Sequence, residues 1–216
     1  MMATALLNPE LTWPEHAARS ADPDALSAIL MPGISLAIWE RKVAPEVPDV
    51  KTLAEINDIS LTAEADQVGA AMILALKEAG YPAEVIGPLT ADIAAHANRL
   101  AQLLVCDTLA IRLEVIETDA CRRFHADYVS VRLILTYVGP GTQWLDNVEA
   151  IRLRNGAAVE ILDVRNVLAG QIALFKGRKW SPDGAIVHRS PPIADTGQRR
   201  LVLVIDPALD AQIPHE

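Results

Sequence analysis

Two segments in the N-terminal half of the chain place apolar residues three and four positions apart, which is the spacing of an amphipathic helix. The first runs from a predicted N-cap at Thr62 to Gly80, a residue type that favours helix ends. The second begins near Thr90 and continues to Leu104. The pattern therefore predicts two helices, each with one face to bury.

From Leu109 onward the pattern changes to short apolar or alternating runs, separated by turns rich in Gly, Pro, Asn and Asp. The runs cover 109–116, 129–138, 148–152, 158–162, 172–175, 185–188 and 200–205. Seven or eight short strands at such intervals are typical of a double-sheet barrel or jelly roll. We therefore expect a mainly β fold with N-terminal helices, a cupin-like double-stranded β-helix.

The first 50 residues are punctuated by proline and contain one strand-like run at 34–39. We interpret them as an arm that lies on the core. With the two helices they would form an N-terminal support over 1–106, and the β-helix would occupy 107–216. A chain of 216 residues is expected to form one compact unit of this kind.

The net charge of −9 argues against nucleic acid or anionic lipid as a partner. No apolar stretch approaches the ~20 residues of a membrane helix. With two cysteines and no recognisable export signal, a cytoplasmic location is the simplest expectation. Residues 121–205 nevertheless hold 12 Arg and Lys against seven Asp and Glu, so a ligand of this region would be anionic. The alternative is that these charges only cover solvated faces.

Candidate chemistry lies in this basic region, at His125, Asp127 and His188. Residues two apart on a strand point to the same side, so His125 and Asp127 can project together into a barrel. A histidine from a later strand would complete two imidazoles and one carboxylate on one face of a metal. That set leaves the opposite positions open, as in non-haem Fe(II) oxygenases, and it suits iron, manganese or zinc. The alternative is a purely structural His–Asp pair.

Arg199 and Arg200 follow His188 after a glycine-containing turn. An antiparallel return would bring one guanidinium back toward the metal, where it could pair with a carboxylate. Residues 201–205 are apolar on both faces, so the pattern does not choose between the two arginines. Surface charge at a strand start is the alternative for either.

Cys121 precedes His125 by four residues, which raises the question of a zinc ligand. On an extended chain the two residues would lie ~13 Å apart. Both could bind one ion only if the backbone turned between them, so a packed thiol is the default expectation.

The triad of His125, Asp127 and His188, with Arg199 or Arg200, resembles the metal ligands and co-substrate anchor of the 2-oxoglutarate- and Fe(II)-dependent dioxygenases. The resemblance covers about 121–206. It implies that 2-oxoglutarate would chelate Fe(II) and that its distal carboxylate would pair with the arginine, helped by Tyr137 or Ser190.

A second resemblance is carried by the segments CRRFHADY at 121–128, GPGTQWL at 139–145 and HRSPP at 188–192. It extends over most of the chain and is to an uncharacterised bacterial family, the domain of unknown function numbered eighteen twenty-six. That family brings no established activity. It implies an occasional association with zinc-homeostasis genes, which keeps a zinc interpretation open.

The leading expectation is a metal-dependent oxygenase that uses Fe(II) and the small anionic co-substrate 2-oxoglutarate on an unknown substrate. The first alternative is a cupin-like protein that binds zinc or another divalent metal without oxidative turnover. A metal-free scaffold is the third. The sequence leaves a homo-oligomer open.

Overall fold

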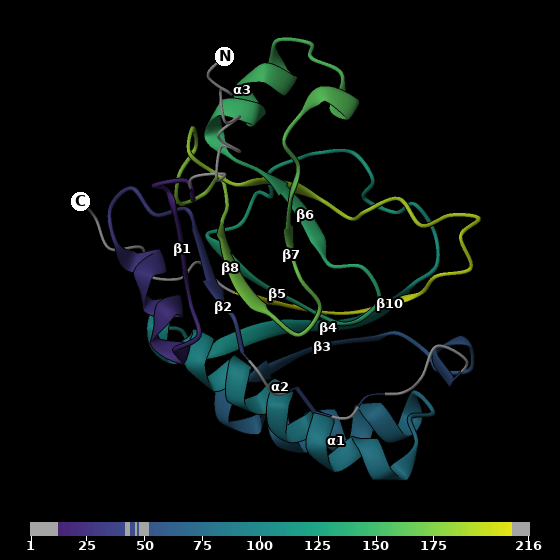
Figure 1. Ribbon diagram of the computed structural model, residues 1–216. Helices are drawn as coiled ribbons and strands as arrows, with labels where there is room; N and C mark the ends of the chain where they lie inside the picture. The colour runs from purple at the N-terminus through teal and green to yellow at the C-terminus, as the bar shows by residue number, and fades with distance from the viewer. Residues whose placement is uncertain (1–12, 42–43, 46, 48–51, 209–216) are drawn as a thin grey trace, which may run out of the picture.

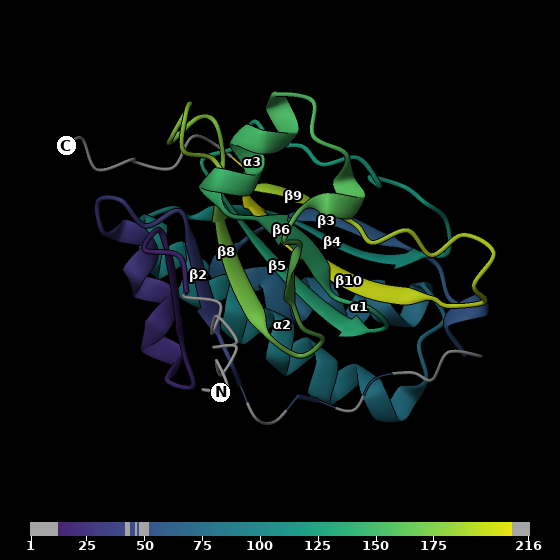
Figure 2. The same cartoon turned by 45° about the horizontal axis from the view of Figure 1, so that its top comes forward.

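The computed structural model describes residues 13–41, 44–45, 47 and 52–208. Two β-sheets lie above one another, and two long helices cover the outer face of the larger sheet (Figure 1; Figure 2). The mainly β architecture with N-terminal helices is therefore confirmed. Parts of the expected N-terminal arm, at 1–12, 42–43, 46 and 48–50, lie outside the described residues.

The larger sheet has seven strands in the order β1-β2-β8-β5-β10-β4-β3. Neighbouring strands are antiparallel, except that β1 and β2 are parallel. Strands from the expected N-terminal support (1–106) and from the expected β core (107–216) pair in this one sheet. The strands are β1 (Ala17–Ser20), β2 (Leu36–Trp39), β3 (Ile59–Glu64), β4 (Thr108–Ile116), β5 (Val131–Val138), β8 (Ile172–Lys176) and β10 (Arg200–Pro207).

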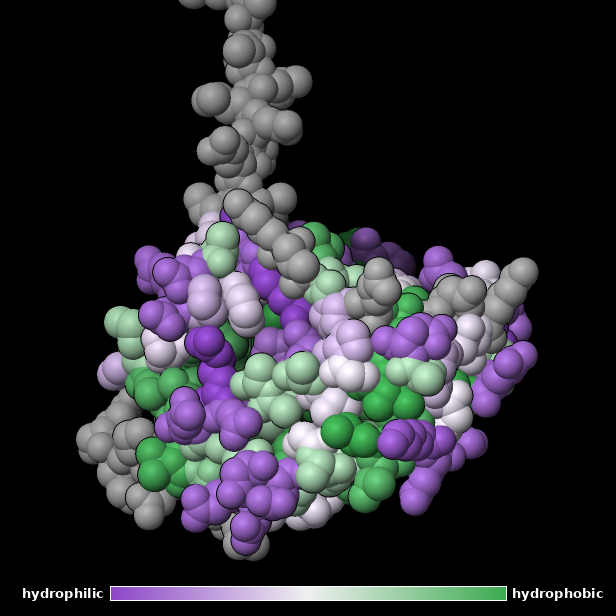
Figure 3. All heavy atoms as spheres, turned by 90° about the horizontal axis from the view of Figure 1, so that it is seen from below, coloured by the Kyte–Doolittle hydropathy of each residue, from purple (hydrophilic) through white to green (hydrophobic). Residues whose placement is uncertain are grey.

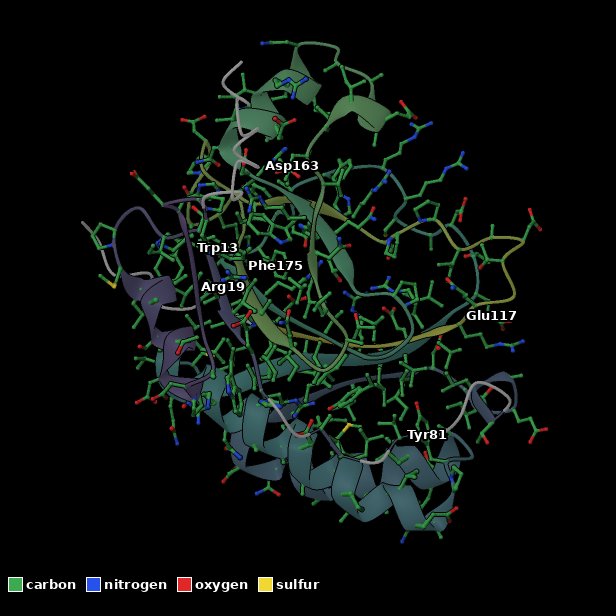
Figure 4. All side chains as sticks on the ribbon, in the orientation of Figure 1. Trp13, Arg19, Tyr81, Glu117, Asp163 and Phe175 are labelled. Atoms are coloured by element: carbon green, nitrogen blue, oxygen red, sulfur yellow. The ribbon has the colours of Figure 1, made fainter. Side chains whose placement is uncertain are left out.

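The smaller sheet has three antiparallel strands in the order β7-β6-β9. They are β6 (Thr142–Leu145), β7 (Arg165–Val167) and β9 (Val187–Arg189). This sheet covers the inner face of the larger one, and Trp144 and Phe175 fill the space between them. Figure 4 shows Phe175 in that space and Tyr81 on the opposite, helical side of the larger sheet.

Each central strand of the larger sheet has two buried faces. On β10, Leu201, Leu203 and Ile205 pack toward the helices. Val202 and Val204 pack toward the smaller sheet, which is the side of Arg200 as well. This alternation explains why 201–205 is apolar throughout: a layer of structure covers the strand on both sides.

Helices α1 (Val68–Glu78) and α2 (Ala83–Leu104) pack on the larger sheet through one apolar cluster that includes Met72, Leu89 and Ile93. Their outer side mixes hydrophilic and hydrophobic side chains (Figure 3). The other helical segments are α3 (Asn147–Arg154), η1 (Pro23–Leu30), η2 (Thr52–Ala54), η3 (Ala65–Gln67) and η4 (Val159–Ile161). No helix among the described residues is long and apolar enough to cross a membrane.

Several local predictions were wrong. Thr62 does not cap a helix; it pairs with Ala110 across β3 and β4, and α1 begins only at Val68. The second helix begins at Ala83 and contains Pro88, earlier than the expected start near Thr90.

The runs at 148–152 and 158–162 are helical and not extended. Asp146 caps α3, because its carboxylate accepts a hydrogen bond from the backbone N–H of Glu149. The second run is the short 3₁₀ segment η4. Apolar runs this short do not distinguish a strand from one or two helical turns.

Candidate metal centre

His125 and His188 lie directly opposite each other in an antiparallel bridge. The backbone N–H of each donates to the carbonyl oxygen of the other, over 3.0 and 2.9 Å. Residues that exchange both hydrogen bonds in this way project their side chains to the same face. The two imidazoles are accordingly 4.9 Å apart between ring centroids, and the ring of Phe175 packs 5.0 Å from that of His188.

Asp127 lies in the loop between β4 and β5, where it was expected to continue a strand. The loop is fixed by the turn after β8: the backbone N–H of Arg178 donates to the carbonyl oxygen of Asp127 over 2.8 Å. Gly177 permits this contact, since a Cβ there would lie 2.2 Å from the carbonyl oxygen of Val129. The carboxylate therefore reaches the histidines from a loop held by backbone contacts.

The ring orientations suit a metal ion. Nδ1 of His125 lies 2.8 Å from the carbonyl oxygen of Arg123, and Nδ1 of His188 lies 3.2 Å from that of Ile186. A carbonyl oxygen can only accept, so Nδ1 carries a proton in each ring, and Nε2 is the nitrogen that can bind a metal once it has lost its own proton.

The three donor atoms are close enough to share one ion. Nε2 of His125 is 3.5 Å from Oδ1 of Asp127, and Nε2 of His188 is 3.2 Å from Oδ2. One donor atom from each of the three residues lies within 4.8 Å of the others. Ligands bound at ~2.0–2.2 Å from a common ion are spaced on this scale. The donor set therefore fits a divalent metal such as iron or zinc.

The electrostatics favour an ionised carboxylate at this centre. Burial alone would raise the pKa of Asp127, but hydrogen bonds from His125 and His188 and the charges of His188 and Arg132 lower it below its usual range. The hydrogen bond with Asp127 raises the pKa of His125, against the effect of its burial. A metal at Nε2 would replace a proton there.

The structure separates the two candidate arginines. Arg200 is 1% exposed, with its guanidinium on the inner face of the larger sheet. Arg199 points outward and pairs with Glu117, which is labelled at the edge of the molecule in Figure 4. The backbone of Arg199 packs against Gly139, where a Cβ would lie 2.2 Å from its carbonyl oxygen, so the β5–β6 turn holds the start of β10 closely.

The guanidinium of Arg200 is surrounded by neutral partners. It donates to the carbonyl oxygen of Pro140 over 2.7 Å and to Oγ of Ser190 over 2.6 Å. It also donates to Oγ1 of Thr136 and of Thr142, each over 3.2 Å. Within the described part of the chain, no carboxylate pairs with it. Burial lowers the pKa of Arg200 to about 10, which reflects the cost of a cation in this setting.

Arg200 and the two histidines line the same cavity, of about 90 Å³. Ser190 lines it as well, and its hydroxyl group contacts Arg200 directly. Cys121 is exposed at the edge of this cavity and is not part of the metal-ligating group.

Tyr137 does not lie near the candidate metal ligands or Arg200. It lies on the helical face of the larger sheet, where its hydroxyl donates to Oδ2 of Asp92 over 2.7 Å. Its neighbour Thr136 occupies the inner face and contacts Arg200 instead. The alternation of faces along β5 is the signal that separates the two residues.

Sequence reasoning missed Arg132. This residue lies on the inner face of β5 and donates from Nη1 to Oδ2 of Asp127 over 2.7 Å. Its other nitrogens bind both oxygens of Asp206 on β10. A single arginine in an apolar strand was the available signal, because a buried arginine needs a partner.

Comparison with known proteins identifies the family. The family model described as Protein of unknown function (DUF1826) matches residues 20–206. The chain belongs to this family. The DUF1826 resemblance carried by the three sequence segments is thus confirmed.

Curated relatives of this DUF1826 protein match only in part. Two probable cytosol aminopeptidases, from Synechococcus elongatus and a Synechococcus species, are each 31% identical over 111 residues, which is 48% of this chain and 21% of the relative. The chain therefore spans about a fifth of the length of these relatives.

Several solved structures resemble the DUF1826 chain at low identity. A dioxygenase for auxin oxidation in rice is 14% identical, with 88% of this chain and 64% of that chain covered and a TM-score of 0.42. A full-length Neurospora crassa protein in complex with alpha-KG is 14% identical (91% and 84% covered, TM-score 0.40). A Pseudomonas putida prolyl-4-hydroxylase is 18% identical (76% and 97% covered, TM-score 0.33). Likeness at this level does not establish a shared fold.

Proposed function

We propose that this protein is an oxygenase that depends on Fe(II) and 2-oxoglutarate. The observation that carries the proposal is the environment of Arg200, a buried guanidinium with neutral partners that opens onto the same cavity as the histidines. A buried cation of this kind is costly unless an anion compensates it. A dicarboxylate that also binds the metal would provide that anion.

Each residue of the centre has a role in this proposal. His125, Asp127 and His188 would hold the metal, because their donor atoms converge and the Nδ1 contacts fix the rings. Fe(II) would supply the activation of dioxygen and the oxidation of the substrate.

Arg200 would bind the distal carboxylate of 2-oxoglutarate. Ser190 and Thr142, whose hydroxyl groups contact its guanidinium, would complete that carboxylate site. Phe175 and Trp144 would exclude water from the side of the metal centre that faces the space between the sheets, since both are packed there.

We also infer that the two sheets form a double-stranded β-helix. The antiparallel pairing within each sheet and the shared apolar cluster between them support this fold. The metal ligands would then lie at the open end of the barrel, on the loop after β4 and on β9.

Anaerobic reconstitution with Fe(II), followed by titration with 2-oxoglutarate, tests the function. We expect one iron per chain and a visible charge-transfer band from the keto acid chelated to Fe(II). His188→Ala should lose both, because it removes one of three ligands. His96→Gln is the matched control: His96 lies in a different buried His–Asp cluster, with Asp92, and its replacement should keep both signals.

The zinc alternative predicts a different result. Tight zinc binding by the triad without any band from iron and 2-oxoglutarate would favour a metal-binding protein without turnover. Equal iron content in the wild type and in His188→Ala would contradict the assignment of the metal centre itself.

A further inference from the structure

Arg132 links the candidate metal ligand Asp127 to Asp206 on a neighbouring strand. Its Nε and Nη2 donate to the two oxygens of Asp206 over 2.8 and 2.7 Å, a two-point contact that fixes the plane of the guanidinium. Its remaining terminal nitrogen, Nη1, donates to Oδ2 of Asp127 over 2.7 Å. The three side chains are 14–18% exposed, so water competes little for these contacts.

The contact distinguishes the two oxygens of Asp127. Oδ2 accepts a short, charge-assisted hydrogen bond from Arg132, which withdraws electron density from that oxygen. Oδ2 also lies 3.2 Å from Nε2 of His188, whereas Oδ1 accepts nothing from Arg132 and lies 3.5 Å from Nε2 of His125. Oδ1 is therefore the oxygen better able to bind a cation.

We propose that Arg132, held by Asp206, is a positioning residue that makes Asp127 a ligand through one oxygen only. This inference rests on the proposed function. A carboxylate bound through both oxygens would occupy a coordination position that the keto acid or dioxygen needs. Partners that orient metal-ligating carboxylates in this way contribute to metal affinity as well.

Arg112 provides a matched control in the same cavity. It lies on the inner face of β4, lines the cavity and pairs with Glu114 over 3.2 Å, without a contact to Asp127. Replacing either arginine by methionine removes one positive charge from the cavity. Only the replacement of Arg132 releases Oδ2 of Asp127.

The test measures the affinity of the full chain for Co(II), an air-stable substitute for Fe(II), and then the affinity of the Co(II)-loaded protein for 2-oxoglutarate. Arg132→Met should bind Co(II) ~10–100-fold more weakly than the wild type. It should also bind 2-oxoglutarate more weakly, because Asp127 then competes for a coordination position. Arg132→Lys, which can reach only one carboxylate, should recover part of both losses, and Arg112→Met should bind Co(II) as the wild type does.

Asp206→Asn tests whether Asp206 acts through Arg132. It should weaken Co(II) binding less than Arg132→Met does, and the double variant should be no weaker than Arg132→Met alone. If Arg132→Met folds poorly, Asp206→Asn compared with the wild type still tests the role of Arg132. Urea unfolding of each metal-free variant separates loss of fold from loss of metal affinity.

The outcomes separate this inference from the proposed function. If the wild type binds Co(II) through the triad while Arg132→Met and Asp206→Asn bind it equally well, only the role of Arg132 is overturned. An equal loss in Arg112→Met would also overturn it. If the wild type binds no Co(II), or if His188→Ala binds as the wild type does, both proposals are overturned.

Discussion

Two buried arginines on opposite faces of the larger sheet have very different surroundings. On the helical face, Arg41 has a side chain that is 5% exposed and donates to Oδ1 of Asp92 over 2.5 Å. The same carboxylate accepts from Tyr137 and lies 3.4 Å from Nε2 of His96. On the inner face, the partners of Arg200 are a carbonyl oxygen and three hydroxyl groups, all neutral.

The difference indicates two different roles. A buried cation that is already neutralised by a carboxylate stabilises the fold and has no charge left to offer a ligand. A buried cation with neutral partners on a cavity is costly in the ligand-free protein and attracts an anion. Arg41 is therefore a structural residue, and Arg200 is the candidate for ligand binding.

The largest expected effect is on the helical face. Asp92→Asn leaves Arg41 buried without a carboxylate, so we expect the free energy of unfolding to fall by about 3–5 kcal/mol in urea denaturation. Glu117→Gln removes the exposed partner of Arg199 and should cost no more than about 1 kcal/mol. Similar losses in the two variants would contradict a special role for the Asp92 pair.

The second prediction concerns acid. Burial alone would raise the pKa of Asp92, but hydrogen bonds from His96, Arg41 and Tyr137 lower it from 3.8 to about 2. A lowered folded-state pKa means that the stabilisation is fully present above 3.8 and is lost as the pH falls toward 2. It amounts to about 2 kcal/mol. The gap in unfolding free energy between the wild type and Asp92→Asn should therefore shrink by this much in acid; a gap independent of pH would contradict the coupling.

The hydroxyl group of Tyr137 has a smaller effect. Burial raises the pKa of Tyr137 well above its usual value, so it remains a hydrogen-bond donor to Asp92. Tyr137→Phe should lower the free energy of unfolding by about 1.5 kcal/mol. Its affinity for 2-oxoglutarate should equal that of the wild type. A loss of that affinity would place Tyr137 at the cavity after all.

The smallest effect on stability is expected at Arg200. Arg200→Met removes a buried charge that has no carboxylate partner among the described residues, and the freed hydroxyl group of Thr142 lines the cavity. The metal-free variant should unfold within about 1 kcal/mol of the wild type. A loss as large as that of Asp92→Asn would show that Arg200 is a structural residue like Arg41.

Much of the sheet was predictable from its sequence pattern. The runs at 109–116, 172–175 and 200–205 match β4, β8 and β10, because buried strands of five or more residues carry a strong apolar signal. The short strands β6 and β7 were missed, because three or four positions are too few to show a period. The six-residue strand β3 was missed as well, because Thr62 was taken for a helix N-cap. The helix α3 was taken for a strand, although Asp146 and Glu149 form an N-terminal capping pattern there.

The candidate site was predictable in its residue types but not in its geometry. The sequence pattern placed His125 and Asp127 on one strand, whereas a bridge holds the first and a loop holds the second. It could not choose between Arg199 and Arg200, because both faces of β10 are buried and apolar, so its sequence shows no alternation of polar and apolar residues. Arg132 depends on Asp206, 74 positions away, and only the register of β5 beside β10 brings them together.

Titration of 2-oxoglutarate into the Fe(II)-loaded wild type, Arg200→Met and Arg199→Ala under anaerobic conditions tests the role of Arg200 most directly. The loss of one charge-assisted pair, about 1.5–3 kcal/mol, should raise the dissociation constant of Arg200→Met by roughly 10–100-fold. Arg199→Ala should bind like the wild type, because its guanidinium pairs with Glu117 outside the cavity. If Arg200→Met binds 2-oxoglutarate as tightly as the wild type, the buried cation is not the co-substrate anchor.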